Sequence, residues 1–87
     1  MKSIEIIPLA LKKIEQRKIS REWIEETLNS PEQIAEGYQG RKIRQRSYTI
    51  SGKKMLLRVV VDEEKDRFIV ITAYLASRVE RYQEGKR

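Results

Sequence analysis

The sequence predicts an α+β fold in which two N-terminal helices pack on one face of an antiparallel sheet. In residues 9–28 the apolar side chains recur every three or four positions, which is the spacing of one helix face. In residues 43–75 they tend to alternate with polar ones, as in strands with one buried face. Helices that precede the strands, rather than alternating with them, are typical of α+β proteins and not of doubly wound sheets.

The first half of the chain is predicted as one strand followed by two helices. Residues 2–7 form a β-branched run that ends at Pro8, which indicates an edge strand. Residues 9–18 form a short amphipathic helix, and Ser20 caps a second helix that is rich in glutamate near its start. Pro31 ends that helix, and residues 31–36 are predicted to add another helical turn. The short connection predicts that the two helices pack as an antiparallel pair.

The second half is predicted as three consecutive strands joined by tight turns into an antiparallel meander. These strands are residues 43–50, 55–61 and 68–75, and residues 77–83 are predicted as a last short helix. The complete order is β-α-α-β-β-β-α. We expect one domain over residues 1–87, a length that suffices for one modest core.

The composition argues against several kinds of site. The chain contains no cysteine and no histidine, so it has no disulfide and lacks both the commonest metal ligand and the usual base at neutral pH. No apolar run reaches the ~20 residues that span a bilayer, and the N-terminus is a poor signal peptide. We therefore expect a cytoplasmic protein that uses no metal and no cofactor.

Residues 37–61 carry the net charge of the protein. They hold seven basic residues and no acidic one, while the other residues hold 12 basic and 13 acidic ones, so that the net charge of +6 divides into +7 and −1. The same segment has the pattern of a β-hairpin around Ser51 and Gly52. Positive charge gathered on one hairpin of a sheet indicates a surface for a polyanion.

The length of the turn decides which side chains of the two strands share a face of this hairpin. A three-residue loop of Ser51, Gly52 and Lys53 sets Arg46 opposite Arg58 and gathers the basic side chains on one open face. A two-residue turn sets the arginines beside the apolar side chains of the second strand instead. We expect the three-residue loop, because unpaired arginines beneath a helix layer are costly to bury.

The open basic face is therefore predicted to bind RNA phosphates, with Tyr48 available to stack on a base. The alternative is a solvated edge strand whose charge prevents aggregation. The residues predicted to bind RNA are Arg41, Lys42, Arg44, Arg46, Tyr48, Lys53 and Lys54.

Two stretches of the chain resemble a small prokaryotic family related to the RelE/ParE toxins. That family tends to open with His-Ala-x-x-Arg-Met-x-x-Arg-x-Ile-Ser, followed by a helix and Pro-x-x-Ile. The residues that fill this pattern here are Ala10, Lys13, Ile14, Arg17, Ile19, Ser20, Pro31 and Ile34. The ending LLRVVVDEEKDRFIVITAYLASRVERY is similar to the last two strands and the tail of RelE-like toxins. The element order also agrees, so the resemblance covers nearly the whole chain.

This resemblance implies a RelE-like type II toxin that binds mRNA in the ribosomal A site and is neutralised by an acidic antitoxin. It also implies RNA cleavage through attack of a 2′-hydroxyl on the adjacent phosphate. The catalytic residues implied by position are Arg46, Lys54, Arg58, Arg78 and Tyr82. Leu9 and Ala76 stand where relatives carry a histidine and an arginine. Three alternatives therefore stay open: a non-catalytic protein-interaction module, a ParE-like toxin that acts on a protein target, and a plain nucleic-acid-binding domain without chemistry.

Overall fold

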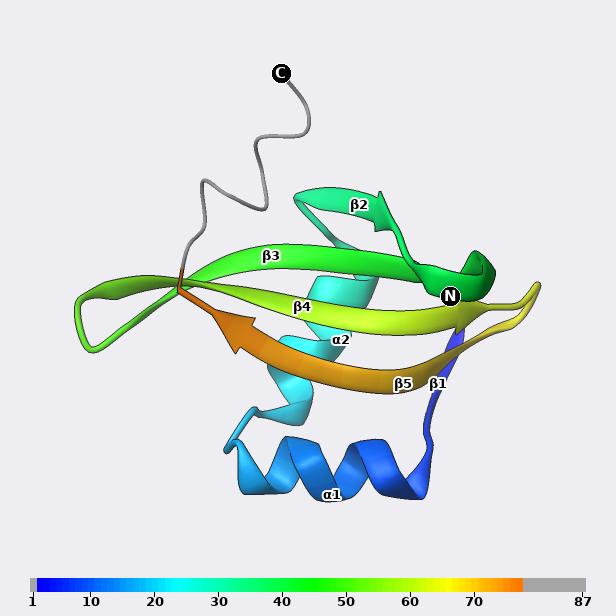
Figure 1. The fold of residues 1–87 in the computed structure, drawn as a ribbon, viewed down its shortest axis with the longest axis horizontal. Coiled ribbons are helices and arrows are strands. Elements are labelled where there is room, and N and C mark those ends of the chain that lie inside the picture. Colours follow the sequence, from blue (N-terminus) through cyan, green and yellow to red (C-terminus); the bar gives the residue numbers. More distant parts are fainter. Residues whose placement is uncertain (1, 78–87) are drawn as a thin grey trace.

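The computed structural model describes residues 2–77 and has the predicted α+β architecture, with two helices on one face of a five-stranded sheet (Figure 1). The elements follow one another as β1 (Ser3–Ile6), α1 (Pro8–Gln16), α2 (Arg21–Asn29), β2 (Gln33–Glu36), the 3₁₀ turn η1 (Tyr38–Gly40), β3 (Lys42–Ile50), β4 (Lys53–Glu63) and β5 (Arg67–Ala76). Apart from Ser77, the predicted last helix lies outside the described residues.

The sheet has the strand order β1-β5-β4-β3-β2. The predicted meander is present, because β3, β4 and β5 pair in sequence with antiparallel neighbours. The predicted first strand is also present and lies at an edge of the sheet. It pairs with β5 in parallel, so the sheet is mixed rather than purely antiparallel.

The two helices begin at the expected signals. Pro8 occupies the start of α1, where its missing N–H costs nothing. Ser20 caps α2, since its Oγ accepts a hydrogen bond of 3.1 Å from the backbone N–H of Trp23. Lys18, in the connection, has a positive φ of 57°.

The predicted antiparallel pairing of the helices is wrong. α1 contacts β5, and Arg17 at its end donates a hydrogen bond of 2.8 Å to the carbonyl oxygen of Ala73. α2 instead contacts β3 and β4 and runs at a steep angle to α1 (Figure 1). Each helix buries its apolar face on the sheet, which leaves little to bury between the two helices.

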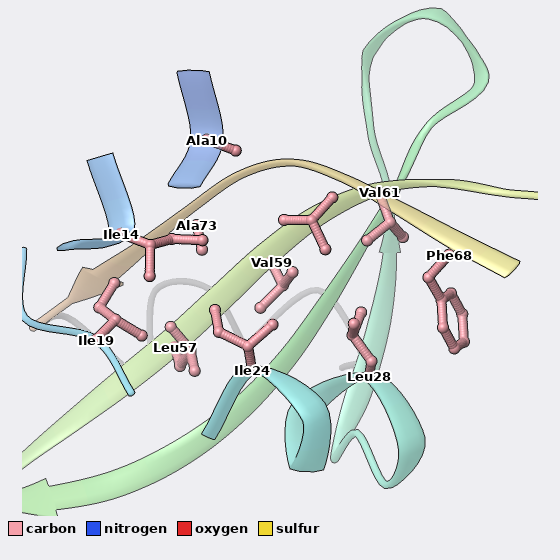
Figure 2. Close-up of a cluster of buried hydrophobic side chains, with 11 residues drawn as sticks. Ala10, Ile14, Ile19, Ile24, Leu28, Leu57, Val59, Val61, Phe68 and Ala73 are labelled. Atoms are coloured by element: carbon pink, nitrogen blue, oxygen red, sulfur yellow. The ribbon is translucent and has the colours of Figure 1, made fainter. Parts of the chain in front are cut away.

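The apolar core fills the space between the helices and the sheet (Figure 2). Its centre is β4, where every second side chain from Leu57 to Val61 points at the helices and is fully buried. The other buried members are Ala10, Ile14, Ile19, Ile24, Leu28, Phe68, Val70 and Ala73. Each large aliphatic side chain buried in this way contributes about 1.5–3 kcal/mol.

The predicted helical turn at residues 31–36 is also wrong, because residues 33–36 form the edge strand β2. This strand pairs with β3 from Gln33 opposite Gln45 to Glu36 opposite Lys42. The carboxylate of Glu32 accepts hydrogen bonds from the backbone N–H and the hydroxyl of Ser47, which fixes the start of the pairing. An isolated helical turn is marginal in water, so the hydrogen bonds offered by the edge of β3 decide the conformation.

The hairpin of β3 and β4 has a two-residue turn, so the predicted three-residue loop is wrong. Ile50 pairs with Lys53, and Ser51 and Gly52 both have positive φ, of 51° and 77°. Positive φ at both central residues is the type I′ geometry that suits the twist of a hairpin. In the resulting register Arg46 lies opposite Leu57 and not opposite Arg58.

Candidate functional site

The register divides the basic residues of the hairpin between the two faces of the sheet. Arg44 and Arg46 lie on the face that carries the helices, in line with Val59 and Leu57. Arg58 and Lys54 lie on the opposite face, which carries no helix among residues 2–77 and which we call the helix-free face. The expectation of a single basic face is therefore wrong.

The two arginines on the helix side bind the end of α2. Arg44 donates a hydrogen bond of 2.8 Å to the carbonyl oxygen of Leu28, and Arg46 donates one of 2.8 Å to that of Ser30. Carbonyl groups at the end of a helix lack partners within the helix and carry partial negative charge. Arginines in these positions satisfy the carbonyl groups and keep their own charges paired.

Arg44 also forms the most buried ion pair of the hairpin. Its Nε donates to Glu63 Oε2 at 2.6 Å, and the two side chains are only 16% and 21% exposed. The guanidinium lies 4.8 Å from the centre of the Phe68 ring. The hydrogen bond from Arg44 holds the pKa of Glu63 below its ordinary value of 4.5.

This pair predicts how stability depends on pH. A lowered pKa means that the unfolded chain takes up a proton on Glu63 at a higher pH than the folded chain does. The contribution of the Arg44–Glu63 ion pair to the free energy of unfolding is therefore complete above the ordinary pKa of 4.5. It is lost as the pH falls through the lowered pKa of the folded state. We expect Glu63→Gln to be less stable at neutral pH and to lose less stability on acidification than the wild type.

Urea unfolding from neutral pH to about pH 2 measures this difference. Glu64→Gln is the matched control, because Glu64 is 47% exposed and forms its ion pair with Arg67 at the surface. The interpretation fails if wild type and Glu63→Gln lose the same stability on acidification.

Other basic residues of the hairpin are paired as well. Arg41 Nε lies 3.3 Å from Asp62 Oδ1, and Lys42 Nζ lies 2.6 Å from Glu36 Oε2. Arg46 adds a longer contact of 3.7 Å to Glu26. All the acidic partners lie outside residues 37–61, so the charge excess of the hairpin is met in large part by acids from the rest of the chain.

Tyr48 also lies on the helix side. Its ring stacks on Trp23 of α2 with centroids 4.0 Å apart, and its hydroxyl donates a hydrogen bond of 2.7 Å to Glu26 Oε1. Burial, together with this hydrogen bond to a carboxylate, raises the pKa of Tyr48. The Tyr48 ring thus serves the contact between α2 and the sheet, with Trp23 as its packing partner.

The helix-free face carries a row of polar side chains that crosses four strands. We call it the polar row; its members are Gln33 of β2, Gln45 of β3, Arg58 of β4 and Tyr74 of β5. Each member lies directly opposite the next in the register of the sheet. Gln45 Nε2 donates to Gln33 Oε1 at 3.3 Å, Arg58 Nε to Gln45 Oε1 at 2.6 Å, and Arg58 Nη1 to the Tyr74 hydroxyl at 2.6 Å.

Arg58 is the centre of the polar row and is held on both sides. Gln45 is fully buried and accepts from Nε, while the half-buried Tyr74 accepts from Nη1. Two hydrogen bonds from one planar guanidinium fix its plane as well as its position. A cation fixed in this way can stabilise negative charge that develops on a bound oxyanion.

Lys54 lies on the same face as Arg58 but not beside it. The fully buried Leu56 separates them along β4, and four residues of strand span about 13 Å. Lys54 and its neighbour Lys53 are both exposed. They belong to opposite faces of the sheet, because Lys53 lies on the helix side, opposite Ile50. A ligand that touches both Lys54 and Arg58 must therefore extend along the strand.

The structure thus brings together only part of the predicted site. Lys54 and Arg58 share the helix-free face, with Arg41 and Asp62 at its far end. Arg78 and Tyr82 lie outside the described residues. Gln33, Gln45 and Tyr74 were not predicted; a two-residue turn would have placed Gln45 opposite Arg58, but no pattern in the sequence indicates Tyr74.

Metal and membrane sites receive no support from residues 2–77. Within that range no group of three or more acidic side chains is placed to hold a metal ion. No helix among the same residues has the length and apolar character that a membrane span requires.

Residues 10–75 match a family described as a domain of unknown function, DUF4258. This range includes both helices almost completely and the four strands that form the polar row. The chain matches no curated protein and no solved structure.

Proposed function

The chain belongs to the DUF4258 family, and we propose that it is a RelE-like type II toxin that binds RNA on the helix-free face and cleaves mRNA on the ribosome. The observation that carries this proposal is the placement of Arg58, whose guanidinium is fixed at the centre of that face by Gln45 and Tyr74. The same proposal includes a cytoplasmic location, an acidic antitoxin and no cofactor.

The ion pairs of the hairpin limit how the RNA is bound. The sequence predicts that Arg44 and Arg46 bind RNA. Because both side chains hold the end of α2, the proposal leaves them out of the RNA contact. Binding instead uses Lys54 and Arg58, which engage about two phosphates. A plot of the logarithm of RNA affinity against the logarithm of salt concentration then has a slope near −0.7 × 2, about −1.4. If Arg44 and Arg46 each bound a phosphate as well, the slope would be about −2.8.

Two adjacent lysines test which face binds RNA. Lys53 and Lys54 are both exposed and carry the same charge, but they belong to opposite faces of the hairpin. We expect Lys54→Gln to weaken binding of single-stranded RNA and to reduce the salt slope by about 0.7. We expect Lys53→Gln to retain the wild-type slope.

Fluorescence anisotropy with a labelled RNA, repeated at several salt concentrations, measures both quantities. Equal losses in the two variants would show attraction by general charge and not by the helix-free face. A wild-type affinity that does not change with salt would remove RNA as the ligand.

The hydrogen-bonded polar row favours one alternative, a non-catalytic module that binds a protein. A face with this row at its centre and the Arg41–Asp62 ion pair at its far end offers directional contacts to a partner backbone as readily as to a phosphate. A ParE-like toxin that acts on a protein target belongs to the same alternative. It is supported if Arg58→Ala abolishes binding of a protein partner while the wild type leaves RNA intact.

A further inference from the structure

Tyr74 has a hydrogen-bonding capacity that residues 2–77 do not use. Its hydroxyl oxygen accepts from Arg58 Nη1 at 2.6 Å, so its own hydrogen must point elsewhere. Among residues 2–77 the Tyr74 hydroxyl takes part in hydrogen bonding as an acceptor and not as a donor. Tyr74 is half-buried on the helix-free face, so the O–H group is a donor available to a ligand bound there.

We propose that Tyr74 is the general acid of the reaction, donating its phenolic proton to the leaving 5′-oxygen of the cleaved RNA. This inference rests on the proposed function and adds to it a catalytic residue that the family resemblance does not supply. It commits the site to a substrate whose leaving group is strongly basic, such as the alkoxide of the 5′-oxygen, because such a group needs a proton as it departs.

The atoms of the proposed step balance. The 2′-oxygen attacks phosphorus, the P–O5′ bond breaks, and its electron pair takes the proton of Tyr74 to give a 5′-hydroxyl. The other product is a 2′,3′-cyclic phosphate, and the proton of the 2′-hydroxyl passes to water. The phenolate of Tyr74 then regains a proton from water, which restores the enzyme.

The neighbours of Tyr74 suit this role. Proton donation leaves a negative charge on the phenolic oxygen, and the guanidinium of Arg58 lies 2.6 Å from that oxygen. A fixed cation at this distance stabilises the phenolate as it forms. Gln45 is a positioning residue in this arrangement, because its buried carbonyl oxygen holds the other side of the Arg58 guanidinium at 2.6 Å.

The test compares two leaving groups in the full-length protein. An mRNA is placed on programmed ribosomes with either the ordinary 5′-oxygen or a bridging 5′-sulfur at the bond that the wild type cuts. A thiolate is far less basic than an alkoxide and departs without a proton. We expect Tyr74→Phe to cut the ordinary RNA about 10²-fold or more slowly than the wild type and to cut the sulfur-containing RNA at the wild-type rate.

The two substrates separate catalysis from structure. Equal losses on both RNAs would overturn the assignment, since a Tyr74 that only positions Arg58 would slow both reactions alike. Cleavage of the ordinary RNA by Tyr74→Phe at the wild-type rate would also overturn it, while leaving the proposed function intact. A folded wild type that cuts neither RNA would contradict the proposed function and this inference together.

Discussion

Arg58→Ala is expected to lower the rate of RNA cleavage by about 10²–10³-fold, the usual effect of removing one group that stabilises a developing oxyanion. Arg58 supplies the fixed cation at the centre of the polar row, and its loss also releases the hydroxyl of Tyr74. Quantified cleavage of a defined mRNA on programmed ribosomes measures the rate. Arg58→Lys keeps the charge but cannot hold Gln45 and Tyr74 with one planar group, so we expect it to remain impaired.

Arg21→Ala is the matched control for Arg58→Ala. Arg21 lies on α2 and is 56% exposed, and among residues 2–77 its ion pair is with Glu25, one helical turn away. Its removal therefore deletes one positive charge without touching the polar row. We expect wild-type cleavage from this variant. Equal losses in Arg21→Ala and Arg58→Ala would contradict the assignment of the chemistry to Arg58.

Of the substitutions proposed for the ion pairs, Arg44→Ala is expected to lower the free energy of unfolding most, by about 3 kcal/mol. The substitution leaves the carboxylate of Glu63 and the carbonyl of Leu28 without their partner in a site where both ion-pair side chains are at most 21% exposed. Breaking one partner of a buried pair costs about 3–5 kcal/mol, and the low end applies because some solvent reaches this pair. Urea unfolding monitored by the fluorescence of Trp23 measures the change.

Lys42→Ala is the control for this effect. Lys42 lies on the same strand and the same face, but its pair with Glu36 is exposed by 37% and 79%, and we expect a loss below about 1 kcal/mol. If the two variants lost the same stability, the distinction between a buried and a surface pair would be wrong.

The parts of the fold that follow from local chemistry could be predicted from the sequence. Ser20 as the cap of α2 and the period of two in residues 43–75 are local signals, and both are confirmed. The strand β2 could not be predicted in this way. Its conformation depends on Glu32 reaching Ser47 and on the free edge of β3, both distant in sequence.

The faces of the hairpin were predicted wrongly because the counter-charges lie elsewhere in the chain. The cost of burying unpaired arginines was the reason to expect a three-residue loop. In the structure the charges of Arg44 and Arg46 are compensated by ion pairs and by hydrogen bonds to the carbonyl groups that end α2. The carboxylates of these ion pairs belong to Glu63 and Glu26. None of these partners lies in the hairpin. A serine in the first central position of a type I′ turn is also a weak signal, since that position favours asparagine, aspartate or glycine.

Tyr74 was missed because its place in the polar row depends on a β-bulge. The register of β4 and β5 shifts between Val60 and Val61, which pair with Thr72 and Val70. Without this shift the register of Val61 would set Arg58 opposite Ala73, and Tyr74 would lie one position away from the row. A one-residue bulge leaves no signal in the alternation of a short strand.

The proposed cleavage of mRNA on the ribosome is tested most directly by primer extension on an mRNA held by programmed ribosomes. Wild type and Arg58→Ala are compared side by side. If the protein is a ribosome-dependent nuclease whose chemistry depends on Arg58, the wild type makes cuts in phase with the codons and leaves ends that carry a 2′,3′-cyclic phosphate. Arg58→Ala then makes the same cuts about 10²–10³-fold more slowly. An mRNA that stays intact over a range of temperatures, with the wild type shown to be folded, would contradict the proposed cleavage and favour the module that binds a protein.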